Sequence, residues 1–318
     1  MKMAESGLPV SERENNSWLH GYAIFVACTT FLLIIAGALV TSNDAGLSVP
    51  DWPTSFGTFR MPRMVGGVLY EHGHRMIAAI VGLLTVIFAL WAWRREPRRW
   101  VRRLAGVAVL TVIAQGVLGG ITVLFYLPVA VSTGHAALAQ TFFCIMVSLA
   151  MFTARGWRWD EPKAEDPRAP SLRHLAVATT GAIYVQLILG AAFRHNGFGI
   201  LPHIVVAMIV TLLVIWMAAR IFSRFTGEKR LVRAMGLLVS LVIVQVFLGV
   251  GAYMMRLASR NAPQPLPPVV NVTTAHVAVG ALVLAASVIL TLQVFRRVAA
   301  PQSSGAMEHL GAEQKAIG

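Results

Sequence analysis

The sequence predicts an all-α integral membrane protein in which eight transmembrane helices form two tandem four-helix bundles. The composition is the first reason: 56% of the 318 residues are hydrophobic and only 13% are charged, whereas soluble domains carry about 25% charged residues. The mean hydropathy of +0.67 agrees with this. The second reason is the presence of eight apolar stretches long enough to cross roughly 30 Å of hydrocarbon. The third is an internal repeat.

The predicted spans are separated by polar connections. They lie near residues 20–42, 71–93, 104–125, 132–153, 174–193, 201–222, 234–256 and 272–295. Each is predicted to be helical, because a backbone in contact with lipid must satisfy its own hydrogen bonds. Cys28 and Cys144 both fall inside spans, so we expect two small hydrophobic side chains and not a disulfide or a metal pair.

Basic residues gather in alternate connections. Six arginines lie between Arg94 and Arg103, the fourth and sixth connections carry five Lys or Arg residues each, and the odd connections carry at most two each. By the positive-inside rule, this predicts a multi-pass protein of a bacterial-type inner (plasma) membrane with both termini in the cytoplasm. The same distribution explains the net charge of +13, so no nucleic-acid-binding function is needed to account for it. The basic residues lie in loops between spans and not on one soluble face.

The chain is expected to divide into five segments. They are a cytoplasmic N-terminal segment (1–19), an N-terminal four-helix unit (20–154), a cytoplasmic linker (155–173), a C-terminal four-helix unit (174–297) and a cytoplasmic tail (298–318). The first segment lacks the short apolar core and the small-residue cleavage site of a signal peptide, so no cleaved signal is expected.

The two units share sequence. "VIAQGVLGG" at 112–120 is echoed by "VIVQVFLGV" at 242–250, an offset of 130. The same comparison aligns two pairs of histidines, His74 with His203 and His135 with His276. Both units begin on the cytoplasmic side, so the repeats are expected to be parallel.

These four histidines are predicted to form one layer. Each lies within about one turn, ~6 Å, of the outer end of an even-numbered span. The second and fourth helices of a four-helix unit can face each other, so each unit can hold one ion between two imidazoles. Two imidazoles in apolar surroundings suit a six-coordinate haem, whereas zinc would need two further protein ligands. Two haem sites are therefore predicted.

The stretch "YEHGHRM" (70–76) makes the two sites unequal. Glu71 and His74 are three residues apart and share a helix face, so Glu71 is expected beside the haem that His74 holds. The second unit has Ile200 at the equivalent position. An ion pair of Glu71 with a neighbouring arginine, Arg75 or Arg63, is the alternative interpretation.

The first outer loop and two arginines complete the predicted site. The loop at 43–67 is longer than an average connection and rich in Pro, Gly and aromatic residues, so an ordered cap over the first site is expected. Arg75 and Arg194 lie near the outer surface, where haem propionates need cations. Arg75 has a second interpretation, as an anchor of its own span.

Three parts of the chain together resemble the haem A synthase family. "EHGHR" fits the family pattern Glu-x-x-His-Arg at Glu71, His74 and Arg75, and "AGLSVPDWPTSFG" is the text of the first outer loop at 45–57. The third part is the set of paired histidines His135, His203 and His276. The resemblance covers all eight predicted spans.

The resemblance implies an oxidoreductase that converts the C8 methyl group of haem O to the formyl group of haem A for cytochrome oxidase. His203 and His276 would be the axial ligands of a resident haem b in the C-terminal unit. Haem O synthase and cytochrome oxidase assembly factors are the implied partners. The sequence identifies no electron donor.

The same resemblance assigns the N-terminal unit to the substrate. His74 and His135 would hold haem O or haem A, with Arg75 beside it, and Glu71 would be catalytic. Two routes stay open. Either one histidine leaves the iron so that oxygen can bind, or the methyl group is oxidised through the macrocycle while Glu71 takes a proton or stabilises positive charge.

The first outer loop departs from the family pattern. Many bacterial members carry a cysteine pair in the first outer loop, where this chain has Val49 and Ser55, so no loop disulfide can pass electrons.

Two other functions stay open. A bis-histidine cytochrome b for electron transfer is disfavoured, since it would gain most from haems at both membrane faces, and the four histidines here lie on the outer side. A haem carrier would not need Glu71 or two unlike halves.

Overall fold

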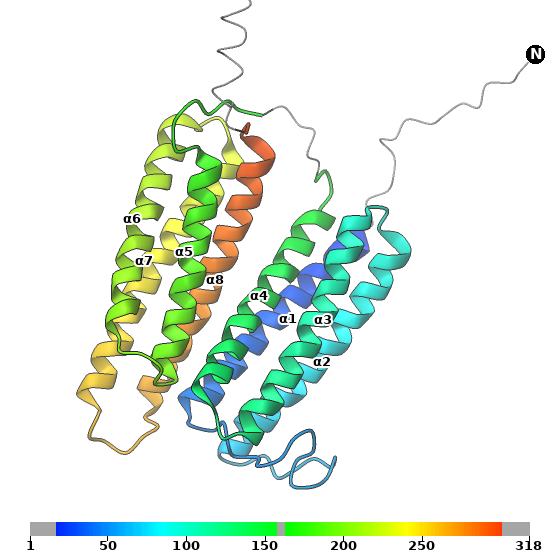
Figure 1. Cartoon of the computed structure of the whole chain (residues 1–318), viewed down its shortest axis with the longest axis vertical. Helices are drawn as coiled ribbons and strands as arrows, with labels where there is room; N and C mark the ends of the chain where they lie inside the picture. The colour runs from blue at the N-terminus through cyan, green and yellow to red at the C-terminus, as the bar shows by residue number, and fades with distance from the viewer. Residues whose placement is uncertain (1–16, 158–162, 301–318) are drawn as a thin grey trace, which may run out of the picture.

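The computed structural model describes residues 17–157 and 163–300. Regular structure in these residues is helical, apart from two isolated bridges, and each helix is long and apolar enough to cross a membrane (Figure 1). The helices are α1 (Ser17–Ser42), α2 (Gly67–Arg95), α3 (Arg99–Leu124), α4 (Val129–Thr153), α5 (Leu172–Arg194), α6 (Leu201–Arg224), α7 (Lys229–Ala258) and α8 (Pro267–Arg297). The prediction of an all-α chain with eight membrane helices is confirmed.

Most helices extend beyond the predicted spans. α7 begins at Lys229 and not near 234, and α8 begins at Pro267 and not near 272. A hydropathy window finds only the hydrocarbon-buried part of a helix. The helix itself continues through the interface, where long basic side chains such as that of Lys229 reach water.

Contacts between helices divide them into two groups of four. α1 and α3 each pack on both α2 and α4, and α5 and α7 each pack on both α6 and α8. Figure 1 shows the groups as two neighbouring columns. The division of the chain into the units 20–154 and 174–297 remains a prediction, as does their relation as tandem copies.

Helix α8 joins the two groups. It contacts α1 and α4 as well as α5 and α7, and it has the largest buried share of the eight helices. Ala281 and Ala285 lie in the apolar core of the first group, while Val283 and Leu284 lie in the core of the second. Small alanine side chains allow close approach of a neighbouring helix. One helix thus packs into both cores.

The end of the molecule opposite the 43–66 loop is held by ionic contacts. Asp166 pairs with Arg220 of α6 at 2.6 Å and accepts a hydrogen bond from the backbone N–H of Leu172 at 2.5 Å. Arg173 donates to the carbonyls of Phe295 and Val298 at the end of α8. The connection before α5 is thereby fixed to α6 and α8.

Parts of three predicted segments lie outside the described residues. The N-terminal segment 1–19 is described only from residue 17, the linker 155–173 lacks residues 158–162, and the tail 298–318 is described only to residue 300. The cytoplasmic location of these segments and the absence of a cleaved signal remain predictions. We call the end that carries the 43–66 loop the predicted outer end.

Candidate functional site

The helix turn that follows the first loop carries a buried ion pair. Glu71 is 4% exposed, and its Oε1 accepts a hydrogen bond from Nη2 of Arg75 at 2.5 Å. Its Oε2 accepts the backbone N–H of Val49 at 2.8 Å. The ion pair foreseen as the alternative role of Glu71 is therefore formed, and its partner is Arg75. A carboxylate retains further lone pairs beyond these two contacts.

Arg75 binds the first loop. Its Nη1 donates to the carbonyls of Asp51 and Thr54 at 2.7 and 3.1 Å, and its Nη2 donates to the carbonyl of Val49 at 3.1 Å. Together with the bond to Glu71, four of the contacts that a planar guanidinium can make are used. The anchoring role of Arg75 is thus evident, and only its Nε–H is left for a propionate.

The tip of the loop is a turn built on Asp51. Its carboxylate accepts the backbone N–H groups of Phe56 at 2.7 Å and Gly57 at 2.8 Å, and the hydroxyl of Thr54. The hydroxyl of Thr54, followed by these two amides, holds the pKa of Asp51 below its ordinary value because each donor favours the charged form. The turn is therefore stabilised while Asp51 is ionised.

Two further contacts fasten the loop to the bundle. The ring of Trp52 lies against Gly120 of α3, where a Cβ would come within 2.6 Å of it. Oγ of Ser55 lies 2.9 Å from Nδ1 of His72 on α2. With the ion pair, these contacts hold the loop across the ends of α2 and α3, in the position of a cap.

The four predicted ligand histidines share one packing arrangement. Each ring rests on a glycine of the preceding helix, at a separation so short that a Cβ on that glycine would crowd it. The distances from an ideal Cβ to the histidine Cε1 are 3.1 Å for Gly37 and His74, 3.3 Å for Gly119 and His135, 2.9 Å for Gly190 and His203, and 2.8 Å for Gly249 and His276. A glycine at each position leaves the room that an imidazole needs.

The depth of the histidines differs from the prediction. α2, α4 and α8 begin earlier than the predicted spans, so His276 lies more than two turns inside α8. α6 begins at Leu201 as predicted, and His203 lies in its first turn. Distance from a helix end is therefore a poor guide to depth. The glycine partners define the common level instead.

The rings of His203 and His276 face each other. Their centroids are 6.3 Å apart and their planes are inclined by 77°. Nδ1 of His203 lies 3.2 Å from the carbonyl of Gln186, which can only accept, so Nδ1 carries the proton and Nε2 has the free lone pair. Two imidazoles that each bind one metal at about 2 Å would have centroids roughly 6 Å apart. The spacing fits a bis-histidine iron.

Two glutamines contact the nitrogens that an iron would take. Nε2 of Gln186 lies 3.3 Å from Nε2 of His203, and Nε2 of Gln245 lies 3.4 Å from Nε2 of His276. Each glutamine comes four residues before the glycine that supports its histidine, and so shares a helix face with it. An amide and a metal would compete for the same lone pair.

The N-terminal pair carries unsatisfied polar atoms. Nδ1 of His74 and Nδ1 of His135 are buried without a hydrogen-bond partner among the described residues, and the same holds for Nδ1 of His276 in the C-terminal pair. A buried polar atom without a partner is costly.

The donor set fits haem better than a bare metal ion. In the described part of the chain, no group of three or more His, Cys, Asp or Glu side chains could hold a metal. Zinc would require four such ligands or three with an open position. A haem requires only the two axial ligands that each pair offers. The residues therefore fit the two haem sites predicted from the sequence.

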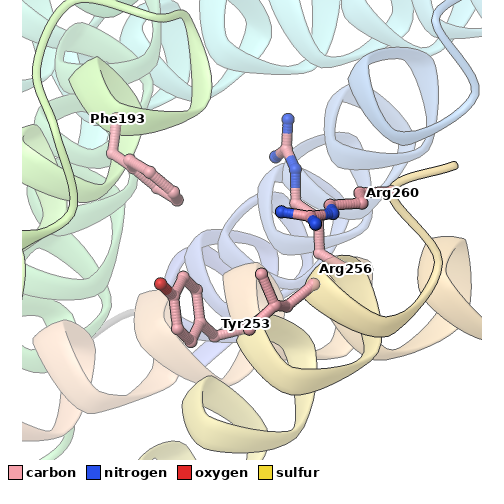
Figure 2. A pocket seen from close by; sticks show the side chains of 5 residues that line it. Phe193, Tyr253, Arg256 and Arg260 are labelled. Atoms are coloured by element: carbon pink, nitrogen blue, oxygen red, sulfur yellow. The ribbon is translucent and has the colours of Figure 1, made fainter.

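A recess lies one turn beyond the C-terminal pair, toward the predicted outer end. It has a volume of about 200 Å³ and is lined by Phe193, Tyr253, Arg256, Leu257 and Arg260 (Figure 2). Phe193 follows Gly190 by three residues and Tyr253 follows Gly249 by four, so both lie on the faces of α5 and α7 whose glycines support the histidines. The guanidinium of Arg256 lies 5.9 Å from the centre of the Phe193 ring.

Nη2 of Arg194 donates to Ser42 at 2.5 Å and to the carbonyl of Ala38 at 3.0 Å, both on α1, and its expected place beside a propionate remains a prediction. Sequence reasoning did not single out the two arginines of this recess, Arg256 and Arg260. Their signal was in the sequence, because two arginines four residues apart on the outer side run against the positive-inside rule.

Comparison with known proteins agrees with this geometry. Residues 64–203 match the family COX15-CtaA, described as cytochrome oxidase assembly protein. The haem A synthase of Symbiobacterium thermophilum is 33% identical over 183 residues, which cover 55% of this chain and 59% of that protein. Those of Lysinibacillus sphaericus and an Exiguobacterium species are 26% and 25% identical, over 58% and 72% of this chain and 60% and 80% of the relatives.

The chain is thus similar to the COX15-CtaA family over residues 64–203 and to haem A synthases over a longer stretch. The aligned region spans less than two thirds of the length of the first two relatives, 59% and 60%. The region matched to the family contains Glu71, His74, His135 and His203. His276 lies outside it, so its pairing with His203 rests on the geometry of this chain.

The COX15-CtaA match also covers part of the first loop, from residue 64. The contacts that hold this loop are made by Glu71, Arg75, Trp52 and Ser55. The two cysteines of the chain lie within α1 and α4 and form no disulfide. This chain therefore fastens its first loop by hydrogen bonds and packing.

Proposed function

We propose that this protein is a haem A synthase, which oxidises the C8 methyl group of haem O to a formyl group and so acts as an oxidoreductase on a CH group. The observation that carries the proposal is the inequality of two otherwise similar histidine pairs. Both pairs rest on glycines, and the rings of the C-terminal pair face each other. Among the described residues, only the N-terminal pair has a buried carboxylate and a fastened loop beside it.

The N-terminal pair is the proposed substrate site. His74 and His135 hold haem O or haem A from opposite sides, and the glycine that supports each ring, as in the C-terminal pair, supports this assignment. The loop that Arg75 fastens excludes water from this end of the site. Exclusion of water protects a reactive site from side reactions.

Glu71 is the proposed catalytic residue. It lies one turn from His74 on the same face of α2, so its carboxylate is at the edge of any haem that His74 binds. Arg75 holds Oε1 and the amide of Val49 holds Oε2, which fixes the orientation of the group. A fixed carboxylate serves either as the base for a methyl proton or as a stabiliser of positive charge.

The C-terminal pair is the proposed site of a resident haem b. His203 and His276 are its axial ligands, and the spacing of their rings supports this. When bound there, haem b would accept and release one electron reversibly. Arg256 and Arg260 in the recess of Figure 2 are placed to pair with its carboxylates, since guanidinium groups bind carboxylates well.

The proposal also includes the membrane location, the orientation and the partners of the protein. It is placed in a bacterial inner (plasma) membrane with both termini in the cytoplasm, on the strength of the charge distribution. Haem O synthase is proposed to supply the substrate, and cytochrome oxidase assembly factors to receive the product. Both histidine pairs are predicted to lie near the same face of the membrane, which argues against a plain transmembrane electron carrier.

Identification of the bound pigments tests the proposal directly. The protein is purified from cells with and without haem O synthase, the haems are extracted with acid, and each is identified by chromatography and mass. Haem b alone is expected without the synthase, and haem A is expected to appear with it. Unchanged haem b in both preparations would contradict the proposed oxidation. Absence of haem from both would contradict the two sites.

A further inference from the structure

A glutamine stands at the same place in three of the four glycine-supported sites. Gln115, Gln186 and Gln245 each come four residues before a supporting glycine, on α3, α5 and α7, and Leu33 takes this position on α1. Residues four apart share a helix face. Each glutamine therefore lies beside a predicted haem ligand, one turn toward the membrane interior.

The three glutamines are used differently. The side chains of Gln186 and Gln245 each contact Nε2 of a histidine in the C-terminal group. In the described residues no hydrogen bond joins the side chains of Gln115 and His135. Oε1 of Gln115 is buried without a partner, as is Oε1 of Gln186 and of Gln245. Gln115 is therefore the glutamine of the three whose amide does not contact a histidine ring, and its acceptor oxygen is unassigned on the side of the N-terminal site that faces the membrane interior.

A haem bound between His74 and His135 has a defined orientation. Its two carboxylates need water or cations and so belong at the predicted outer end. The opposite edge of the macrocycle then faces the membrane interior, at the level of Gln115, about one turn or ~6 Å from Gly119. Haem O carries a hydroxyethylfarnesyl group on that edge, where protohaem has a vinyl group. Its hydroxyl is buried and needs a hydrogen-bond partner.

We propose that Gln115 accepts this hydroxyl and so selects a hydroxyalkyl-bearing haem over protohaem in the N-terminal site. The inference rests on the proposed function, because it takes haem O as the substrate.

A binding measurement tests this role without turnover. Ferric haem O and ferric protohaem are titrated, in detergent and without reductant, into protein purified from cells that lack haem O synthase, and occupancy of the N-terminal site is followed by the visible spectrum. The variant is Gln115→Met, which keeps the length of the side chain and removes its polar atoms. The matched control is Gln140→Met, a buried glutamine on α4 whose Oε1 also lacks a partner.

The control residue, Gln140, differs from Gln115 in that its side chain points away from the predicted haem ligand of its region. Gln140 comes five residues after His135, so it lies roughly 140° around α4 from that histidine. The wild-type protein is expected to bind haem O more tightly than protohaem. Gln115→Met should reduce this preference about tenfold, the effect of one buried hydrogen bond, and Gln140→Met should keep it.

Three results would overturn the proposal. They are equal binding of both haems by the wild-type protein, an unchanged preference in Gln115→Met, and an equal loss of both affinities in Gln115→Met. The last would make Gln115 a positioning residue for His135 alone. Because binding is measured at equilibrium, a preference for haem O combined with no haem A in co-expressing cells would contradict the oxidation and leave the selectivity standing.

Discussion

Glu71 and Arg75 form a 2.5 Å ion pair within one turn of α2, and both also bind the backbone of the first loop. The loop, the carboxylate and the guanidinium are therefore one hydrogen-bonded unit. Removing one member leaves a buried charge without its partner and releases part of the loop. The anchoring role and the catalytic role of this unit are separable, because the two side chains contact the loop differently.

Glu71→Gln tests the catalytic role. The amide keeps the size of the side chain and a carbonyl oxygen for the N–H of Val49, but it cannot take a proton or stabilise positive charge. We expect haem content to stay at the wild-type level and haem A formation to fall at least tenfold, as measured by acid extraction from cells that make haem O. Full haem A output would assign Glu71 to the ion pair alone.

Arg75→Lys tests the anchor. Lysine keeps a positive charge near Glu71 but cannot reproduce the fork that reaches the carbonyls of Val49, Asp51 and Thr54. We expect the loop to loosen and trypsin to cleave after the exposed Arg60 and Arg63 several-fold faster than in the wild-type protein. Glu71→Gln serves as the control and should change the cleavage rate less. Equal rates in all three proteins would contradict the anchoring role.

The charge state of Asp51 is expected to govern the loop turn at low pH. The pKa of Asp51 is lowered by the hydroxyl of Thr54 and the two amides, so the turn gains stability above the unfolded value of about 3.9. That gain is lost as the pH falls through the lower folded pKa. In infrared difference spectra against Asp51→Asn, the protonated carboxyl band should appear only below pH ~4. A band already present at higher pH would contradict the assignment.

Loss of one ligand should empty the C-terminal site. His203→Ala or His276→Ala removes one of the two imidazoles whose centroids are 6.3 Å apart, and a haem with one axial ligand is not the low-spin species. We expect the low-spin haem b spectrum to disappear from protein made without haem O synthase. His174→Ala, at the start of α5 beside Ser171, is the control and should retain it. A variant with full haem b content would remove that histidine from the ligand set.

The features that sequence reasoning found are those with a period or a repeat. Eight apolar stretches gave eight helices because hydrocarbon thickness dictates their length. His74, His135, His203 and His276 stood out because the repeat aligned them, and all four meet a glycine. The alternative ion pair of Glu71 was found from spacing alone, since residues four apart on a helix are neighbours.

The features that were missed depend on contacts between helices. No sequence pattern shows that Gly249 faces His276, or that Arg194 donates a hydrogen bond to α1. The three guanidinium contacts of Arg75 to the first loop depend on the fold of that loop, where no repeat exists to compare. The ends of helices were misplaced because the hydropathy of the sequence decreases several residues before the helix ends.

The glycine supports provide the sharpest test of the shared packing, and α7 offers a matched pair. A Cβ at Gly249 would lie 2.8 Å from Cε1 of His276, whereas a Cβ at Gly236 would meet nothing within 4 Å. In Gly249→Ala the ring must move, because overpacking of this kind costs about 1–3 kcal/mol. A cost of ~1.4 kcal/mol corresponds to a tenfold change in affinity.

We therefore expect Gly249→Ala to bind haem b roughly tenfold more weakly, as measured by haem titration of the purified protein, and Gly236→Ala to bind it as the wild-type protein does. Both variants replace a glycine by the better helix former, so a general effect on α7 would appear in both. Equal weakening in the two proteins would show that His276 does not depend on its glycine. Unchanged binding in Gly249→Ala would show that the ring can bind iron from a shifted position, and the shared packing would then have no bearing on ligation.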